Sequence, residues 1–213
     1  MHLKGNRPVV ITVHVPVIVA VIVNAMDWIL ASNSPRRKEL LASLGLSFSC
    51  ASADVEEVNV DFHPQPEIVA QNNAQKKAEH VTDLYPKAYV IGADTIVTLE
   101  GKIFYKPKDI LEAKHMLQQL AGKQHTVITG VSVACKAEQF LKTFFDKTFV
   151  YFKPLSDAFI DEYSKSVHPL DKSGAYAIQD PLTQTFARIS GSESNVVGFP
   201  VEKFAELILK SKF

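Results

Sequence analysis

Residues 29–41 read Ile-Leu-Ala-Ser-Asn-Ser-Pro-Arg-Arg-Lys-Glu-Leu-Leu, an apolar run followed by a small polar turn and the start of a helix. Ser34 suits the N-cap of that helix and Pro35 its first position, so the turn offers free backbone amides and hydroxyl groups to an anion. Arg36 and Arg37 follow in the first turn, where the helix dipole disfavours cations. The stretch predicts a strand, a turn and a helix, and it indicates either a phosphate site or an ordinary solvated helix start.

Strand-like and helix-like segments alternate along the rest of the chain, which is typical of an α/β domain. No internal repeat or low-complexity tract interrupts them. In the helix predicted after a polar loop at 54–66, Ile68, Val69, Ala78 and Val81 form the expected apolar face. The predicted strands are 28–31, 47–51, 89–99, 102–105, 125–134, 143–152, 175–178 and 185–189, and the predicted helices are 35–44, 67–85, 109–120, 156–166 and 200–209.

The composition is that of an ordinary globular protein, because 46% of the 213 residues are hydrophobic and 22% are charged. This length suits one domain, or one domain with two lobes around a cleft. The 23 basic residues equal the 23 acidic residues, so no basic field attracts nucleic-acid polymers and any anion site must be local. Cys50 and Cys135 form no CxxC pair, which argues against a zinc site and indicates buried, inert thiols in a reducing compartment.

The first residues form an apolar extension. Residues 9–23 are almost wholly apolar, but they are fewer than the roughly 20 needed to cross a bilayer, and Pro16 weakens a helix there. Three explanations stay open: a signal peptide cleaved near 23–25, an extension upstream of a protein that begins near Met26, and an added edge strand. We assign residues 1–27 to an extension and residues 28–213 to the domain, and we expect a cytoplasmic protein with no membrane association.

Asp94 stands in the middle of the apolar strand Val-Ile-Gly-Ala-Asp-Thr-Ile-Val at 90–97. An unpaired charge is costly in such a place, so this carboxylate needs a metal ion, a lysine or a water as its partner. Gly92 and Ala93 leave room for a ligand to approach the backbone. A purely structural ion pair with a lysine is the alternative explanation.

Other polar and charged residues indicate a functional site only in combination with Asp94. Glu56 and Glu57 in the polar loop offer a second carboxylate, and hard cations such as Mg²⁺ prefer carboxylate oxygens. Gln179, expected at a strand end, could bond a nucleobase edge. The sequence contains no P-loop, zinc-protease or serine-hydrolase motif. Cations and carboxylates together suit phosphoryl chemistry, although each is ordinary on a protein surface, and the lysines concerned are Lys76, Lys77 and Lys106.

Five separated segments resemble, in order and spacing, the Maf family of nucleotide pyrophosphatases over about residues 28–209. They are 30–37 (Leu-Ala-Ser-Asn-Ser-Pro-Arg-Arg), 92–95 (Gly-Ala-Asp-Thr), 106–107 (Lys-Pro), 170–176 (Leu-Asp-Lys-Ser-Gly-Ala-Tyr) and 197–200 (Val-Gly-Phe-Pro). The resemblance implies a two-lobed, mixed-sheet α/β fold like that of inosine triphosphate pyrophosphatases, with a nucleotide cleft between the lobes. It also implies a protein that is often a homodimer.

The resemblance further implies a hydrolase that acts on a nucleoside triphosphate and releases pyrophosphate and a nucleoside monophosphate. Water attacks the α-phosphorus, assisted by Mg²⁺ or Mn²⁺. Asp94 corresponds to the family's proton acceptor, and Glu57 joins it at the metal. Lys77 is preferred to Lys76 because of its Lys-Ala context. The phosphate-binding residues that the resemblance implies are Ser32, Arg37, Lys77 and Lys106.

Three positions distinguish the subfamilies, and here they are Arg36, Thr95 and Gln179, a set that resembles the dTTP/UTP type. Relatives that act on 7-methyl-GTP carry a bulky aromatic residue in place of Arg36. Asp180 stands where a glycine usually follows the glutamine, and Glu193 stands in a segment that usually carries an aromatic residue, so either could alter the base pocket. The alternatives are a pyrophosphatase for modified nucleotides and a cell-division (septum) regulator that does not depend on hydrolysis.

Overall fold

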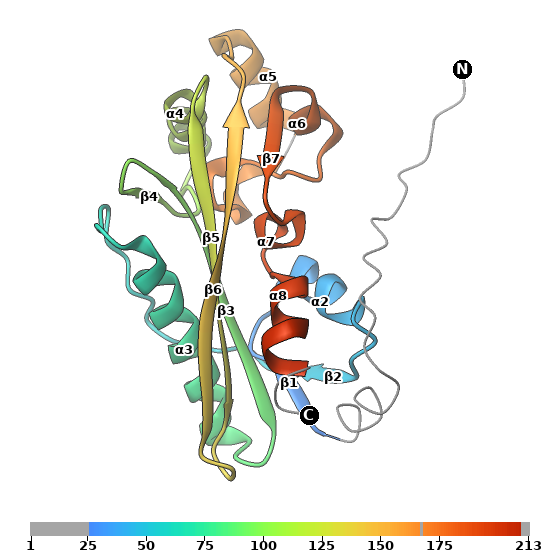
Figure 1. The fold of residues 1–213 in the computed structure, drawn as a ribbon. Coiled ribbons are helices and arrows are strands. Elements are labelled where there is room, and N and C mark those ends of the chain that lie inside the picture. Colours follow the sequence, from blue (N-terminus) through green and yellow to red (C-terminus); the bar gives the residue numbers. More distant parts are fainter. Residues whose placement is uncertain (1–25, 167, 210–213) are drawn as a thin grey trace.

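A computed structural model describes residues 26–166 and 168–209, which form a mixed α/β fold around a seven-stranded sheet (Figure 1). The strands run in the spatial order β2-β1-β3-β5-β6-β7, and β4 pairs with β3. β1 is parallel to β2 and β3, whereas the other pairs are antiparallel. The strands are β1 (Trp28–Leu30), β2 (Phe48–Cys50), β3 (Tyr89–Leu99), β4 (Lys102–Phe104), β5 (Gln124–Cys135), β6 (Phe140–Phe152) and β7 (Ala187–Ser190).

Helices cover both faces of the sheet. α3 lies along one face of β3 and β5, whereas α2 and α8 lie on the other side (Figure 1). The helices are α2 (Pro35–Ala42), α3 (Pro66–Leu84), α4 (Ile110–Leu120), α5 (Asp157–Ser166), α6 (Pro181–Phe186), α7 (Glu193–Val197) and α8 (Val201–Phe204), which continues as the π-helical turn η3 (Ala205–Leu209). Two short 3-10 turns, η1 (Pro169–Asp171) and η2 (Ser173–Ala175), lie between α5 and α6.

Most predicted elements are confirmed, and the helix starts show why. Ser34 caps α2 and Pro35 takes one of its first positions, as the sequence indicates. Asp109 caps α4 by accepting a hydrogen bond from the N–H of Glu112 at 2.8 Å. These local signals place the helices, because a side-chain oxygen at the N-cap satisfies a backbone donor that would otherwise have no partner.

Three expectations about secondary structure and burial are wrong. The strand predicted at 175–178 does not form, because Gly174 and Ala175 have φ angles of 72° and 65° and turn the chain in η2. Ile68, expected on the apolar face of α3, is 39% exposed because the buried stripe of this helix begins at the next residue. Cys50 is exposed rather than buried because β2 is an edge strand, whereas Cys135 is buried as expected.

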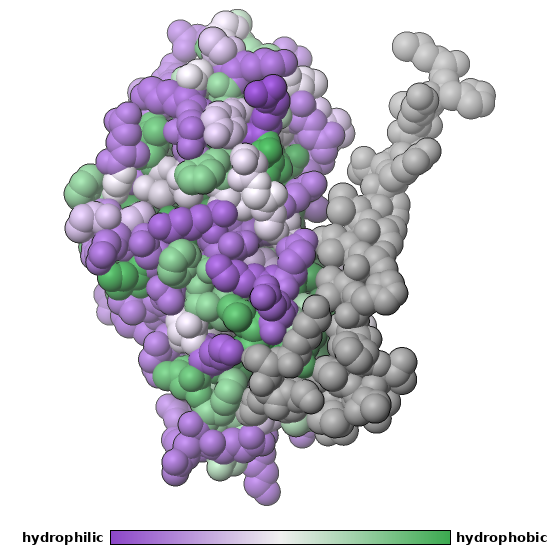
Figure 2. All heavy atoms as spheres, viewed as in Figure 1, coloured by the Kyte–Doolittle hydropathy of each residue, from purple (hydrophilic) through white to green (hydrophobic). Residues whose placement is uncertain are grey.

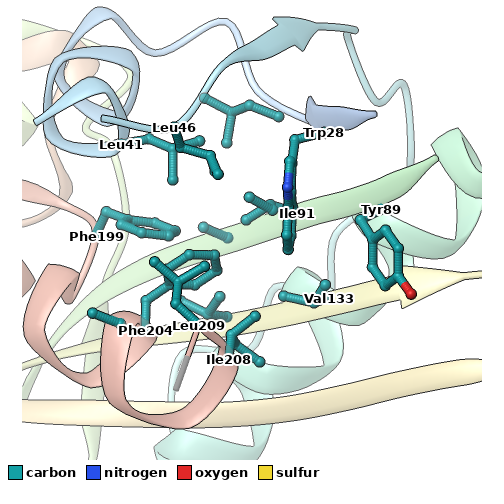
Figure 3. Close-up of a cluster of buried hydrophobic side chains, with 14 of the residues drawn as sticks. Trp28, Leu41, Leu46, Tyr89, Ile91, Val133, Phe199, Phe204, Ile208 and Leu209 are labelled. Atoms are coloured by element: carbon teal, nitrogen blue, oxygen red, sulfur yellow. The ribbon is translucent and has the colours of Figure 1, made fainter. Parts of the chain in front are cut away.

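The hydrophobic core is divided between two lobes that share the long strands β3, β5 and β6. In the first lobe α2, α8 and η3 pack against β1 and β3, and the side chains of Trp28, Phe199 and Phe204 converge there (Figure 3). In the second lobe α4, α5 and α6 pack around Phe152 and Tyr163. The outer face drawn in Figure 2 is mainly hydrophilic, with hydrophobic residues interspersed. The two-lobed, mixed-sheet prediction is therefore confirmed.

β3 lacks a neighbouring strand along the middle of one edge. Its first part pairs with β1 as far as Ile91, and its last part pairs with β4 from Val97 onward. Between them, residues 92–96 pair with β5 on the other edge and with no other described strand. Because side chains alternate across a strand, Asp94 faces α3 and Thr95 faces α2. Because no described strand covers this edge of β3 between β1 and β4, both side chains reach the same cavity between the lobes.

Two glycines allow α3 to lie close against the sheet. A Cβ atom at Gly92 would lie 2.1 Å from the carbonyl oxygen of Ala74, and one at Gly130 would lie 2.4 Å from the backbone of the same helix. The interpretation that Gly92 makes room for a ligand is therefore wrong, because α3 fills that space. This close approach carries the buried residues Asn73 and Lys77 to the sheet.

The apolar extension at residues 1–25 lies outside the described residues, so its assignment as an extension stays a prediction. Among the helices that the structure describes, none has the length and apolar character needed to span a membrane.

Candidate active site

A cavity of about 550 Å³ opens between the lobes, beside the unpaired edge of β3. Its walls come from the turn after β1, the loop before α3, the middle of β3, the segment after β4 and the η1–η2 region. Every residue to which the family resemblance assigns a role in catalysis, binding or specificity lines this cavity. They are Ser32, Arg36, Arg37, Glu57, Lys77, Asp94, Thr95, Lys106 and Gln179.

The turn between β1 and α2 forms the first wall. Ser32 Oγ accepts a hydrogen bond from the N–H of Ser34 at 3.2 Å, and Ser34 Oγ accepts one from the N–H of Arg37 at 3.4 Å. The predicted N-cap is therefore confirmed. The positive end of the α2 dipole lies at the cavity, where it favours an anion.

The guanidinium of Arg37 is held by acceptors from three parts of the chain. Nε donates to the carbonyl oxygen of Gly198 at 3.0 Å, Nη2 to Thr95 Oγ1 at 3.1 Å, and Nη1 to Ser32 Oγ at 3.4 Å. Burial lowers the pKa of Arg37, while the carboxylates of the cavity act in the opposite direction. A guanidinium carries five N–H groups, so the held side chain keeps donors for an anion.

The hydroxyl of Thr95 belongs to a chain of hydrogen bonds behind Arg37. Its oxygen lies 3.0 Å from Thr129 Oγ1, and Thr129 donates to the carbonyl oxygen of Asn195 at 3.0 Å. Because Thr129 gives its single hydroxyl proton to Asn195, Thr95 is the donor in the contact between the two threonines. This geometry favours a role for Thr95 in fixing the arginine, because its oxygen accepts from Arg37 and its proton is directed to Thr129.

Asp94 is paired with a lysine, and the same lysine holds a second carboxylate. Lys77 Nζ lies 2.8 Å from Asp94 Oδ1 and 2.7 Å from Glu57 Oε1. Asp94 and Lys77 are buried, whereas Glu57 is exposed. Lys76, one residue earlier, is also exposed and reaches the carbonyl oxygen of Glu56 at 3.3 Å. Of the two lysines, Lys77 is therefore the one that meets Asp94.

Sequence reasoning missed Asn73, which is buried on α3 beside the same carboxylate. Its Nδ2 donates to Asp94 Oδ2 and to the carbonyl oxygen of Val58, both at 3.1 Å. Its Oδ1 accepts from the N–H of Val58 at 2.7 Å. The available signal was helical spacing, because Asn73 lies one turn before the lysine that meets Asp94. The partner in the loop could not be read from that spacing.

Arg36 reaches across the cavity to the second lobe. Its Nη1 lies 3.0 Å from Asp171 Oδ2, and its Nη2 donates to the Asp171 carbonyl oxygen at 3.3 Å. Lys172 Nζ lies 2.5 Å from the other carboxylate oxygen. Burial raises the pKa of Asp171, but the hydrogen bonds from Lys172 and Arg36 outweigh it and hold this pKa below its usual value. Asp171 and Lys172 line the cavity, although sequence reasoning gave them no role.

The remaining expected residues lie at the rim. Lys106 and Gln179 are exposed, and Gln179 stands in a turn rather than at the end of a strand as predicted. Asp180 caps α6 by accepting from the N–H of Leu182 at 2.9 Å. Asp180 and Glu193 are both absent from the described lining of the cavity. Their departure from the family pattern therefore does not alter the cavity wall directly.

The second lobe gives the cavity an apolar wall. Tyr176 stands behind it, with its hydroxyl 2.9 Å from His125 Nε2. Burial lowers the pKa of His125 to about 3, so this imidazole is neutral near pH 7. The charged groups come mainly from the first lobe and α3, whereas the apolar wall is formed by Val97, Val127, Tyr176, Ile178 and Val196.

Glu57 and Asp94 are the carboxylates that could hold a metal ion in this cavity. Among residues 26–166 and 168–209, no three His, Cys, Asp or Glu side chains gather as a metal site. One or two carboxylates are nevertheless enough for Mg²⁺, which commonly keeps waters and takes substrate phosphates as ligands. The donor set fits a hard divalent cation whose coordination an anionic ligand completes.

The fold and this cavity define an α/β protein with a cleft that has charged groups and a helix N-terminus on one wall and apolar side chains on the other. The chain belongs to the Maf family, because the family model described as Maf-like protein matches residues 27–211. The resemblance seen in the sequence is thus confirmed.

Curated relatives cover most of the chain. A dTTP/UTP pyrophosphatase of Bacillus pumilus is 44% identical over 181 residues, which are 84% of this chain and 94% of that protein. A dTTP/UTP pyrophosphatase of Symbiobacterium thermophilum is 41% identical over 84% of this chain and 91% of its own length. Among solved structures, a nucleoside-triphosphatase/dITP/XTP pyrophosphatase of Mycobacterium abscessus is 13% identical to this chain, with a TM-score of 0.42. The match covers 61% of this chain and 76% of that protein's chain.

Proposed function

We propose that this protein hydrolyses dTTP and UTP to the nucleoside monophosphate and pyrophosphate. The observation that carries the proposal is the buried Lys77–Asp94 pair, 2.8 Å apart, in a cavity with an apolar wall on its far side. The charged groups suit a triphosphate, and the apolar wall suits a base. The dTTP/UTP pyrophosphatases that share 41% to 44% of their aligned residues with this chain support the same activity.

In the reaction, a water oxygen forms a bond to the α-phosphorus while the bond from that phosphorus to the bridging oxygen of pyrophosphate breaks. Asp94 accepts the proton of the water, which is possible because each carboxylate oxygen keeps a lone pair beyond its present hydrogen bond. Lys77 donates to Asp94 Oδ1, and its ammonium stabilises the negative charge that develops on the phosphate in the transition state. Ser32, Arg37 and Lys106 hold the phosphates.

Glu57 and Asp94 would hold the divalent cation, Mg²⁺ or Mn²⁺. When bound, such a cation neutralises phosphate charge and polarises the phosphorus–oxygen bonds. In the protein without substrate, the ammonium of Lys77 forms ion pairs with both carboxylates and partly neutralises them.

We assign discrimination between nucleotides to Arg36, Thr95 and Gln179, in two different ways. Arg36 and Gln179 border the cavity with groups that can contact the substrate. Thr95 acts through Arg37, because its hydroxyl is bonded within the protein. A pyrophosphatase for modified nucleotides such as 7-methyl-GTP would use the same machinery, so the substrate panel below separates the two.

We also propose a cytoplasmic location, since Cys50 and Cys135 are free thiols, as expected in a reducing compartment. A homodimer, the assembly that the resemblance implies, stays a prediction that the mass of the protein in solution tests.

The activity is tested by measuring pyrophosphate release from dTTP, UTP, dCTP, dATP, dGTP and 7-methyl-GTP, each with Mg²⁺ and with Mn²⁺. We expect dTTP and UTP to give the highest kcat/KM, and Asp94→Asn to remove turnover. Asp83→Asn is the matched control, because Asp83 is an exposed carboxylate near the far end of α3. Preferred cleavage of 7-methyl-GTP, or full activity of Asp94→Asn, would contradict the proposal.

A further inference from the structure

Asn73 connects three parts of the site that are far apart in the sequence. It is fully buried on α3, and its amide makes hydrogen bonds to Asp94 of β3 and to both backbone groups of Val58 in the loop that carries Glu57. Both N–H groups and the oxygen of the amide are used. A buried amide with every polar atom bonded is held in one orientation.

That orientation is fixed by the backbone. The N–H of Val58 can only donate, so it must meet the amide oxygen, and it does so at 2.7 Å. The amide nitrogen therefore faces Asp94 Oδ2, which must accept. The lone pair of Oδ2 that receives this bond is therefore occupied, and the amide fixes the direction in which that oxygen points.

The amide of Asn73 and the ammonium of Lys77 link Asp94 to the Glu57 loop through two separate sets of contacts. Lys77 joins Asp94 Oδ1 to Glu57 Oε1, and Asn73 joins Asp94 Oδ2 to the residue directly after Glu57. Asn73 and Lys77 lie one helical turn apart on the same face of α3, so one rigid helix sets both contacts. The two carboxylates thereby take a fixed position relative to each other.

We propose that Asn73 is a positioning residue for hydrolysis, which orients Asp94 and holds the Glu57 loop against it. The inference rests on the function proposed above. Asn73 does not line the described cavity, so it acts through Asp94 and Glu57 rather than by touching the substrate. A catalytic group misplaced by about 1 Å typically costs about 10²-fold in rate, and we expect a loss of that size in kcat.

Two substitutions separate the contacts of Asn73. Asn73→Asp keeps the shape and an acceptor for the N–H of Val58, but it replaces the donor to Asp94 with a second negative charge. Asn73→Ala removes all three bonds and leaves space for water at the loop. Val81→Ala is the stability control, because Val81 is buried on the same helix and does not itself line the cavity. Asn72→Ala is the control at the exposed neighbour.

Each protein is assayed for kcat and KM with dTTP, and the stoichiometry of binding is titrated with the α,β-methylene analogue of dTTP. We expect both Asn73 variants to lose about 10²-fold in kcat with KM within about threefold and one binding site per chain. Hydrogen exchange at the Val58 amide should become fast in Asn73→Ala and stay slow in Asn73→Asp. The two controls should keep the kcat of the wild type.

A kcat for Asn73→Asp within about threefold of the wild type would overturn the proposal. So would a fall in kcat that only follows a fall in binding stoichiometry, because that result marks a loss of folded protein. These outcomes differ from failure of the proposed function, in which the wild-type protein itself releases no pyrophosphate from any nucleotide of the panel.

Discussion

Arg36 and Asp171 join the two lobes across the cavity, with Arg36 Nη1 3.0 Å from Asp171 Oδ2, although 135 residues separate them in the chain. The same arginine also bonds the Asp171 backbone, so the contact fixes the η1 turn as well as a side chain. An incoming nucleotide would compete with Asp171 for this guanidinium. In the free protein, Asp171 therefore already occupies the arginine to which we assign discrimination between nucleotides.

Neutralising Asp171 should make Arg36 more available. The two side chains are 30% and 60% exposed, so the pair contributes little to stability, about 1 kcal/mol or less. We expect Asp171→Asn to leave the melting temperature nearly unchanged and to lower KM for dTTP by up to about fivefold. Steady-state kinetics at low and high salt measure this effect, with Glu193→Gln as the charge-removal control outside the cavity. A higher KM would instead show that Asp171 holds Arg36 in its binding position.

Replacing Arg37 by lysine keeps the charge but loses the planar fork. An ammonium cannot reach Gly198, Thr95 and Ser32 together, as the guanidinium does. We expect Arg37→Lys to lower kcat/KM for dTTP by about 10- to 10²-fold, mainly through KM. Arg188→Lys on the exposed part of β7 should have no effect. Equal kinetics for the two variants would remove Arg37 from the phosphate site.

Adding one methyl group at Gly92 should disturb the site by displacing α3, the helix that carries Lys77. Its Cβ would lie 2.1 Å from the carbonyl oxygen of Ala74, so α3 must move away from the sheet and take Lys77 with it. We expect Gly92→Ala to cost more than about 2 kcal/mol of unfolding free energy and to lower kcat. Gly122→Ala is the comparison, since its Cβ would meet nothing nearer than 3.7 Å and only its φ of +71° is strained, at about 1 kcal/mol. Urea denaturation of both variants gives the two values.

Acid should destabilise the fold through His125. The pKa of this imidazole falls from 6.5 to about 3 on burial, so between these two pH values the unfolded chain takes up a proton that the folded chain does not. Stability is therefore full above pH 6.5 and falls as the pH is lowered, by about 2 kcal/mol at pH 5. His125→Gln, which does not titrate, should show a weaker loss between pH 7 and pH 5 in urea denaturation. Parallel curves for the two proteins would exclude this histidine as the cause.

The parts of the site that the sequence predicted are those with local signals. Ser34 and Pro35 mark a helix start by their own chemistry, and Asp94 is conspicuous because it interrupts an apolar strand. The contact between Asn73 and Val58 left no such signal, since an asparagine in a helix is usually exposed and its loop partner is set by tertiary packing. Gly92 was misread for the same reason, because only the fold shows that a helix rather than a ligand lies against it.

The strand at 175–178 shows the limit of composition in the fold itself. Ala-Tyr-Ala-Ile has the apolar character of a buried strand, and Ala175, Tyr176 and Ile178 are indeed buried. The positive φ angles at Gly174 and Ala175 turn the backbone instead. Burial could be inferred from the residues, but the turn that produces it depends on contacts with Val97 and Tyr105 elsewhere in the chain.

The unpaired stretch of β3 places two neighbouring residues in separate environments. Asp94 is packed among groups of α3, whereas Thr95 belongs to a hydrogen-bond chain on the opposite face of the sheet. A substitution at Thr95 can therefore alter how Arg37 is presented without repacking the surroundings of Asp94. Because side chains alternate along a single strand, neighbouring residues 94 and 95 can be substituted separately, each within its own set of contacts.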